Sequence, residues 1–257
     1  QAQSKLSNSS FSSPLTQAQL FKHISTPITM EKTFTIKVLE TEMATHDVKR
    51  FKCSKPSGFK FTPGQATDLT IKKPSLSNKK NPFTFTSLPE DNYLEFTIKM
   101  YPLREEGVTK HLKDIKKGDE FLIREPFGAI HYKGKGVFIA GGAGITPFIS
   151  ILRSLKKQKA LKGNTLIFSN KTDKDIINEE EFDKMQALGL RKVYTVTRSP
   201  SLDPKIDNKR IDESYLKEKI KDFNQHFYVC GPATMVGELH SILKSLGAKA
   251  EEIVIET

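Results

Sequence analysis

The segment Ala140–Phe148, with the sequence AGGAGITPF, decides the fold of this chain. It lies directly after the apolar run Val137–Ala140 and directly before the amphipathic run Pro147–Lys157, so it joins a predicted strand to a predicted helix. The glycines allow a sharp turn and a close approach of the main chain to a pyrophosphate, which the positive end of the helix attracts. Thr146 is placed to cap the helix, and Pro147 suits its first turn. We expect phosphate binding by Gly141, Gly142, Gly144, Thr146 and Pro147, with a strand-to-helix turn that binds no ligand as the alternative.

Strand and helix patterns alternate after Gly134. Predicted strands and helices follow one another at Val137–Ala140, Pro147–Lys157, Thr165–Ser169, Glu179–Leu188, Val193–Thr197, Glu213–Lys221, Phe227–Cys230, Ala233–Leu246 and Ile253–Ile255. This alternation predicts a doubly wound parallel sheet with helices on both faces and a ligand at the carboxyl ends of its strands.

The strand Phe227–Cys230 runs into the turn Cys230-Gly231-Pro232. As the fourth strand of the predicted sheet it should neighbour the first, so this turn should face the same crevice as the glycine segment. A single cysteine at the end of a strand is more often inert packing than a reactive group. We nevertheless expect Cys230, Gly231 and Pro232 to border the ligand, because two independent motifs converge there.

Residues 31 to 132 show short strand patterns separated by turn signals, and helical periods are scarce. The predicted strands are Thr33–Leu39, Val48–Cys53, Ala66–Ile71, Phe83–Thr86, Leu94–Met100 and Phe121–Arg124. The alternation in Leu94–Met100 predicts one buried face, and the pattern as a whole predicts an antiparallel six-stranded β-barrel. We therefore expect an extension over residues 1–30, a barrel domain over 31–132 and an α/β domain over 133–257.

The segment Asn81–Ser87, NPFTFTS, combines aromatic rings and hydroxyls in one strand. Alternation places Phe83 and Phe85 on one face and Thr84 and Thr86 on the other, which presents a flat surface beside hydrogen-bonding groups. A plain core strand is the alternative interpretation.

Composition narrows the class of protein. The formal net charge is +11, which suits an anionic partner, but the lysines are scattered, so we do not expect nucleic-acid binding. The two cysteines, Cys53 and Cys230, are too few for a four-cysteine cluster, and we expect no metal. An integral membrane segment is not expected either, since no run approaches the length that a spanning helix needs, and we expect a cytoplasmic location.

Four motifs together resemble the ferredoxin–NADP reductase superfamily. The strand Pro82–Ser87, the turn Gly107-Val108-Thr109, the loop Gly141–Pro147 and Cys230-Gly231-Pro232 occur here in the order of that superfamily, and the resemblance covers residues 31 to 257. It looks closest to the flavodoxin-reductase-like and cytochrome b5 reductase-like branches; Ser169–Ile176, SNKTDKDI, suggests the latter.

The resemblance implies a flavin-dependent reductase, in which the barrel holds FAD and the α/β domain holds NADH or NADPH. By similarity, Phe83 would pack against the isoalloxazine with Asn81 and Pro82 beside it, and Thr84 would hydrogen-bond near N5. The amides of Gly107, Val108 and Thr109 would bind the FAD pyrophosphate, while the glycine loop would bind the nicotinamide nucleotide. Cys230 would lie near the nicotinamide ring, so Thr84 and Cys230 are the implied catalytic pair.

The chain departs from this superfamily at Asn81, where an arginine is usual. An arginine fork suits a phosphate, so its loss leaves the diphosphate charge to backbone amides and to Lys79 or Lys80. The loop after the second α/β strand offers Asp173 and Asp175, which disfavour a 2′-phosphate, and Lys171 and Lys174, which would welcome one. Similarity to the cytochrome b5 reductase-like branch favours NADH, with Asp175 as the discriminating acid.

The expected reaction is hydride transfer from NAD(P)H to bound FAD, followed by electron transfer to an acidic carrier such as flavodoxin, ferredoxin or a cytochrome. One alternative is an FMN-containing reductase component of an oxygenase. Another is a non-catalytic nucleotide-sensing or interaction protein on the same scaffold, which the departure at Asn81 keeps open.

Overall fold

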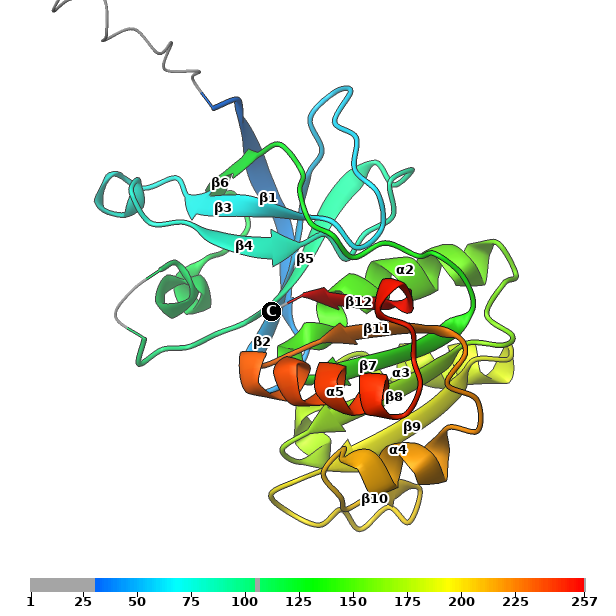
Figure 1. Cartoon of the computed structure of the whole chain (residues 1–257). Coiled ribbons are helices and arrows are strands. Elements are labelled where there is room, and N and C mark those ends of the chain that lie inside the picture. Colours follow the sequence, from blue (N-terminus) through cyan, green and yellow to red (C-terminus); the bar gives the residue numbers. More distant parts are fainter. Residues whose placement is uncertain (1–30, 105–106, 257) are drawn as a thin grey trace, which may run out of the picture. The chain divides into compact units, whose positions relative to one another are not determined.

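The computed structural model describes residues 31–104 and 107–256, and Thr33–Thr257 form one compact unit (Figure 1). The extension predicted over residues 1–30 lies outside the described residues. The first six strands form one sheet and the last six form another. We call them the barrel and, with its helices, the α/β half.

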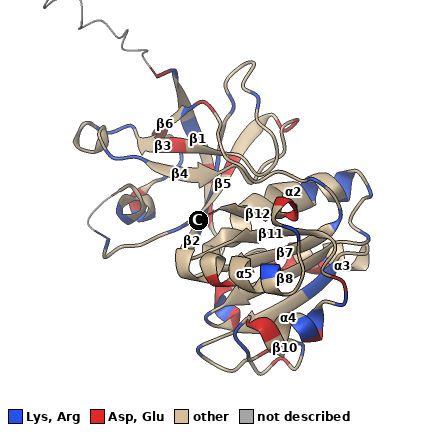
Figure 2. Cartoon of the chain, in the orientation of Figure 1, with Lys and Arg blue, Asp and Glu red and all other residues tan. Residues whose placement is uncertain are grey.

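Lysine and arginine are spread over both the barrel and the α/β half (Figure 2). Among the described residues, no helix combines the length and the apolar character needed to cross a membrane.

The barrel is an antiparallel sheet of six strands in the order β4-β3-β6-β1-β2-β5. A bridge between Phe85 and Phe96 brings the end of β4 against β5 and nearly closes the sheet, which confirms the predicted barrel. Short 3₁₀ helices, η2 (Pro74–Leu76) and η3 (Thr109–Asp114), lie in its connections. The strands are β1 (Thr33–Met43), β2 (Val48–Ser54), β3 (Ala66–Ile71), β4 (Asn81–Thr84), β5 (Tyr93–Lys99) and β6 (Glu120–Arg124).

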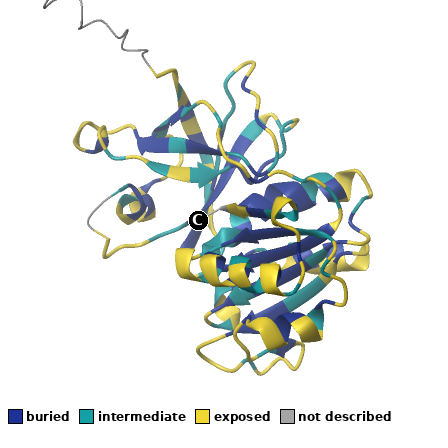
Figure 3. Ribbon diagram, viewed as in Figure 1, coloured by how far each residue is buried: buried dark blue, intermediate teal, exposed yellow. Residues whose placement is uncertain are grey.

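Strand β5 differs from its prediction, because it is buried on both faces rather than one (Figure 3). Leu94, Phe96 and Ile98 pack in the barrel core as expected. Glu95 and Thr97 on the opposite face are only 7% and 4% exposed. The carboxylate of Glu95 is paired with an arginine of the α/β half, which explains how polar side chains are buried there.

The α/β half contains a parallel sheet in the order β10-β9-β8-β7-β11-β12. Its strands are β7 (Gly136–Gly141), β8 (Thr165–Asn170), β9 (Arg191–Val196), β10 (Ile206–Asp207), β11 (His226–Cys230) and β12 (Ile253–Glu256). β7 and β11 are neighbours, as the motif argument requires. Strand β10 is absent from the prediction, because a two-residue strand carries no readable period.

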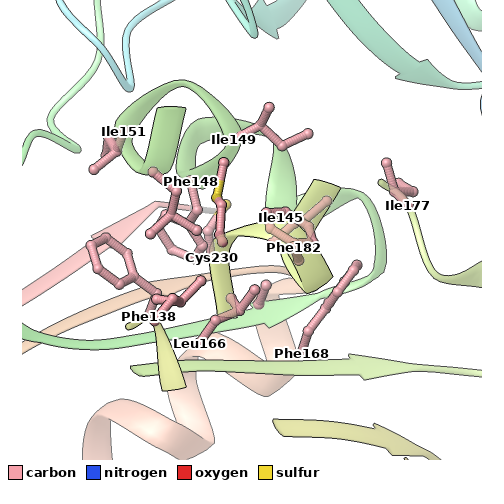
Figure 4. Packing of buried hydrophobic residues seen from close by; sticks show 14 of the residues in the cluster. Phe138, Ile145, Phe148, Ile149, Ile151, Leu166, Phe168, Ile177, Phe182 and Cys230 are labelled. Atoms are coloured by element: carbon pink, nitrogen blue, oxygen red, sulfur yellow. The ribbon is translucent and has the colours of Figure 1, made fainter. Parts of the chain in front are cut away.

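Two hydrophobic cores cover the faces of this sheet, since successive side chains of each buried strand alternate between them. Phe138 and Ala140 of β7 pack with helices α2 (Thr146–Lys157) and α3 (Glu179–Ala187) (Figure 4). Val137 and Ile139 pack with α4 (Glu213–Lys219) and α5 (Ala233–Ser245). Burial of one large apolar side chain stabilises the fold by about 2–3 kcal/mol, so the two cores hold the strand ends in fixed positions.

Candidate functional site

The glycine segment leaves the carboxyl end of β7 and forms a short 3₁₀ helix, η4 (Gly142–Ile145), before α2 begins at Thr146. The predicted cap is wrong: Ile145 occupies the N-cap position, and Thr146 is the first helical residue. Its hydroxyl donates to the carbonyl of Ala143 at 3.1 Å, because η4 runs directly into α2. Pro147 lies in the first turn of α2, as predicted.

The glycine loop and the Cys230-Gly231-Pro232 turn lie against each other. A Cβ atom on Gly144 would be 2.3 Å from the carbonyl oxygen of Cys230, and one on Gly231 would be 3.1 Å from the amide nitrogen of Gly141. The approach at Gly144 is too close for any side chain, whereas the one at Gly231 is tight and would need a small shift of its neighbour. Gly142 adopts a φ of +52°, and a Cβ there would meet open space. The loop therefore approaches the neighbouring strand closely on one side and leaves room for a nucleotide phosphate on another.

Cys230 packs against the hydrophobic core formed with α2 and is 9% exposed. Figure 4 shows it among Ile145, Phe148 and Phe138. The position at the carboxyl end of β11, beside the glycine loop, matches the sequence prediction, and its surroundings are apolar.

The two segments predicted to bind the flavin are also side by side. The side-chain oxygen of Asn81 accepts a hydrogen bond from the amide of Val108 at 2.8 Å. A Cβ atom on Gly107, whose φ is +81°, would lie 2.3 Å from the same oxygen. Asn81 therefore connects β4 to the Gly107–Thr109 turn, and the Val108 amide that was expected at the pyrophosphate is already used by Asn81.

The remaining residues of the β4 motif differ in exposure. Pro82 is exposed, Thr84 is half-buried, and Phe83 packs against the edge of the barrel core. Phe85 and Thr86, which follow β4, are fully buried, so the exposed part of this motif is confined to Asn81–Thr84.

Thr109 carries a buried hydroxyl for which the described residues provide no hydrogen-bond partner, although the residue is only 5% exposed. It begins η3, directly after Val108. Leaving such a group unsatisfied is costly, and a flavin diphosphate oxygen is a suitable acceptor for it. The Gly107–Thr109 turn therefore fits the pyrophosphate of FAD.

Lys49 of β2 contacts the end of η3, the helix that follows this turn. The sequence analysis did not identify this residue. Its ammonium group is buried and donates to the carbonyls of Leu112, Lys113 and Ile115 at 3.4, 3.0 and 2.6 Å. Burial lowers the pKa of Lys49, and the nearby carboxylates only partly oppose this. The contact fixes the end of η3 with a positive charge, where the helix dipole favours one.

Asp175, predicted as the acid that selects NADH, is engaged with other side chains. It lies in the 3₁₀ helix η5 (Asp173–Asp175), and its Oδ2 accepts from the amide and hydroxyl of Thr172 at 3.0 and 2.7 Å. Its Oδ1 lies 3.8 Å from the ammonium of Lys99 and 3.9 Å from the ring of His46, both in the barrel half. Burial opposes ionisation, but the hydrogen bonds from Thr172 and these two groups hold the pKa of Asp175 below its ordinary value.

His46, Asp47 and Asp175 are close enough together to suggest a cation site. The ammonium of Lys99 already lies 2.6 Å from the carboxylate of Asp47, so the cluster has its positive charge from the chain itself. The arrangement joins the loop after β8 to the barrel.

Comparison with known proteins matches two domain families in the chain. Residues 30–166 match a family model for an FAD-binding domain, and residues 138–240 match one for an oxidoreductase NAD-binding domain. NADH-cytochrome b5 reductase 2 of Danio rerio is 28% identical, with 86% of this chain and 83% of that protein covered. The ferredoxin–NAD(P)⁺ reductase component of the naphthalene 1,2-dioxygenase system of Pseudomonas putida is 25% identical, with 84% and 66% covered. A ferredoxin NADP⁺ reductase from Neisseria gonorrhoeae with bound FAD and NADP has a TM-score of 0.76 at 20% identity, covering 88% of this chain and 98% of that one.

The antiparallel barrel and the adjoining α/β half, with their matches to FAD-binding and NAD-binding domain families, define an NAD(P)H-dependent flavoprotein reductase of the ferredoxin–NADP reductase superfamily. The chain belongs to the FAD-binding domain family, whose model matches more than half of its length.

Proposed function

We propose that Thr84 and Cys230 border the place where the nicotinamide meets the flavin. The nucleotide side of this proposal is supported by the close approach of Gly144 to the carbonyl of Cys230. The flavin side is supported by the hydrogen bonds from α2, the helix after the glycine loop, to the carbonyls of Thr86 and Ser87, which follow Thr84. When bound, FAD accepts a hydride from the nicotinamide and releases its electrons singly. The chain's own contribution is to orient the two rings and to exclude water from them.

On the flavin side, Phe83 would supply an apolar surface and Thr84 a hydroxyl that could hydrogen-bond the ring. The Gly107–Thr109 turn binds the pyrophosphate, chiefly through the Thr109 hydroxyl and the amides that Asn81 leaves available. Asn81 would act by holding this turn rather than by binding phosphate.

On the nucleotide side, Gly141, Gly142 and Gly144 bring the main chain to the nucleotide phosphates at the start of α2. Thr146 and Pro147 shape the first turn of that helix, and the Cys230-Gly231-Pro232 turn borders the ring. We propose domain limits of 31–132 for the FAD-binding barrel and 133–257 for the NAD(P)-binding half, because the last barrel strand ends at Arg124 and β7 begins at Gly136.

NADH is the proposed electron donor. Asp173 is exposed beside Asp175 in the loop after β8, and negative charge there disfavours the 2′-phosphate of NADPH. The relatives named NADH-cytochrome b5 reductase support the same choice.

The decisive experiment is anaerobic mixing of the FAD-reconstituted chain with NADH or NADPH. We expect the yellow flavin absorbance to bleach with either nucleotide, and kcat/KM to be at least about tenfold higher with NADH. A Thr84→Val variant should keep its FAD but bleach more slowly, since it lacks the hydroxyl that could hydrogen-bond the ring.

Each alternative gives a different result in the same experiment. Chromatography of the flavin extracted from the chain as purified, before any flavin is added, would separate an FAD protein from an FMN protein. A chain that stays colourless with added FAD would support the nucleotide-sensing alternative, and equal kcat/KM for the two nucleotides would refute the choice of NADH.

An acidic electron carrier is the proposed acceptor, with a ferredoxin or a cytochrome suggested by the relatives' names and flavodoxin as a further candidate. Exposed lysines lie on the loop between β3 and β4 and along η3 and the turn after it: Lys73, Lys110, Lys113, Lys116 and Lys117, with Lys72 and Lys80 beside them paired to Glu120 and Asp68. Backbone hydrogen bonding between Lys72 and Glu120 brings the two segments together. A cytoplasmic location stays a prediction.

Such a basic surface steers an acidic carrier by long-range attraction, so the association rate depends on salt. We expect the rate of carrier reduction to fall several-fold between low salt and about 0.5 M salt, where the Debye length is only a few ångströms. The bleaching rate with NADH is the control, because that step does not involve the carrier. A carrier rate that is independent of ionic strength would refute the proposed surface.

A further inference from the structure

Helix α2 continues directly from the glycine loop and is also hydrogen-bonded to the barrel segment that follows β4. It begins directly after the loop, and two of its side chains donate to successive barrel carbonyls. The hydroxyl of Ser150 donates to Ser87 O at 2.9 Å, and Nη1 of Arg153 donates to Thr86 O at 2.7 Å. Thr86 and Ser87 follow Thr84 within three residues, so one helix links the two candidate sites.

Arg153 lies between two carboxylates that come from different halves of the chain. Its Nε and Nη2 donate to the two carboxylate oxygens of Glu181 in α3 at 2.7 and 2.8 Å. Its Nη1 donates to Glu95 of β5 at 2.6 Å. Burial alone would lower the pKa of Arg153, but the hydrogen bonds to Glu181 and Glu95 raise it above its ordinary value. A bidentate guanidinium contact fixes direction as well as distance, which a lysine could not do.

Glu95 is also hydrogen-bonded to Thr86 and Ser87, the two residues that α2 contacts. Its carboxylate accepts from the Thr86 hydroxyl at 2.7 Å, and its backbone amide donates to Ser87 Oγ at 3.0 Å. The side chain of Glu95 is 10% exposed and that of Arg153 is 19% exposed. The segment after Thr84 is thus hydrogen-bonded on one side to β5 and on the other to α2.

The same network returns to the barrel at a second point. Glu181 accepts from the side-chain amide of Asn178 at 2.8 Å, and Asn178 accepts from Nη2 of Arg50 in β2 at 2.6 Å. Two separate attachments, through β5 and β2, restrict rotation of the α/β half against the barrel.

We propose that Arg153 is a positioning residue for hydride transfer, which sets the separation between the nicotinamide on the glycine loop and the flavin beside Thr84. The proposal rests on the proposed function. Hydride transfer requires reacting atoms about 3–3.5 Å apart, and a misplacement of about 1 Å can cost about 100-fold in rate. Helix α2 begins at the glycine loop, and its Ser150 and Arg153 are hydrogen-bonded to the segment that follows Thr84. This helix can therefore fix the distance between the two rings.

The test compares Arg153→Met with wild type in the full chain reconstituted with FAD. We expect the rate constant for flavin reduction by NADH to fall at least about tenfold, while the dissociation constants for FAD and NADH change less than about threefold. The charge-transfer absorbance of the nicotinamide–flavin pair should weaken, because it reports ring stacking. Arg191→Met is the matched control, since the guanidinium of this exposed arginine donates to Lys219 O, within the α/β half.

Two milder variants cover the case in which Arg153→Met does not fold, because it leaves Glu95 and Glu181 without their partner. Ser150→Ala removes one contact to Ser87 and keeps a good helix former, and Arg153→Lys keeps the charge without the fork. Both should slow flavin reduction and weaken the charge-transfer band at near wild-type Tm. Unchanged reduction rates in these variants, or FAD affinity that falls in parallel with the rate, would overturn the proposal. A wild-type chain that NADH does not reduce would instead refute the proposed function.

Discussion

A Gly144→Ala variant is expected to bind NADH about 10- to 100-fold more weakly than wild type and to lose about 1–3 kcal/mol of unfolding free energy. The new Cβ would lie 2.3 Å from the carbonyl oxygen of Cys230 and 2.6 Å from Cα of Gly231. Both neighbours are backbone atoms, so the glycine loop must move away from β11. Nucleotide titration and thermal denaturation measure the two effects.

Gly237→Ala is the matched control for this prediction. Gly237 lies inside α5, and a Cβ there would meet no atom within 4 Å. Alanine should therefore leave NADH binding unchanged and raise stability by up to about 1 kcal/mol, through its better helix propensity. Wild-type affinity and Tm in Gly144→Ala would mean that the loop does not need its close approach to Cys230.

A Gly107→Ala variant is expected to bind FAD about 10- to 100-fold more weakly, with NADH binding less affected. Gly107 has a φ of +81°, where a side chain costs about 1–2 kcal/mol. Its Cβ would also lie 2.3 Å from the oxygen of Asn81 and would displace the side chain that holds Val108. Quenching of flavin fluorescence on binding gives the affinity.

Gly118→Ala is the control that separates the free-energy cost of a side chain at positive φ from the loss of FAD binding. Gly118 has a similar φ of +96°, but a Cβ there meets no atom within 4 Å and it lies outside the proposed site. This variant should lose similar stability and keep its FAD affinity. Equal losses of FAD affinity in the two variants would contradict the role assigned to the Gly107–Thr109 turn.

Local sequence patterns were sufficient for the architecture. The alternation of apolar runs with amphipathic ones predicted β7, β8, β9 and β11 and the four helices, because strand and helix periods are properties of short segments. The glycine loop and the Cys230 turn could be placed together for a topological reason, since the first and fourth strands of this fold are neighbours.

The polar contacts between the two halves could not be predicted in the same way. Arg153 is paired with Glu95, 58 positions earlier, and Lys49 donates to carbonyls more than 60 positions later. In the sequence these residues look like ordinary surface charges, because nothing local distinguishes a buried ion pair from a solvated one. For the same reason, the alternating pattern of β5 did not reveal that Glu95 and Thr97 on its second face are buried.

The attachment of Asp175 to the barrel limits how the coenzyme preference of this chain can be redesigned. A graft that replaces residues 171–178 with the loop of an NADPH-using enzyme would remove the carboxylate beside Lys99 and His46 and the amide bound to Arg50. Lys99 would keep its pairing with Asp47 and Arg50 its pairing with Glu42, but both would lose their contacts with the loop. The foreign loop would then no longer be attached to the barrel. A loop replacement must therefore include matching changes at Lys99 and Arg50 if it is to test coenzyme preference alone.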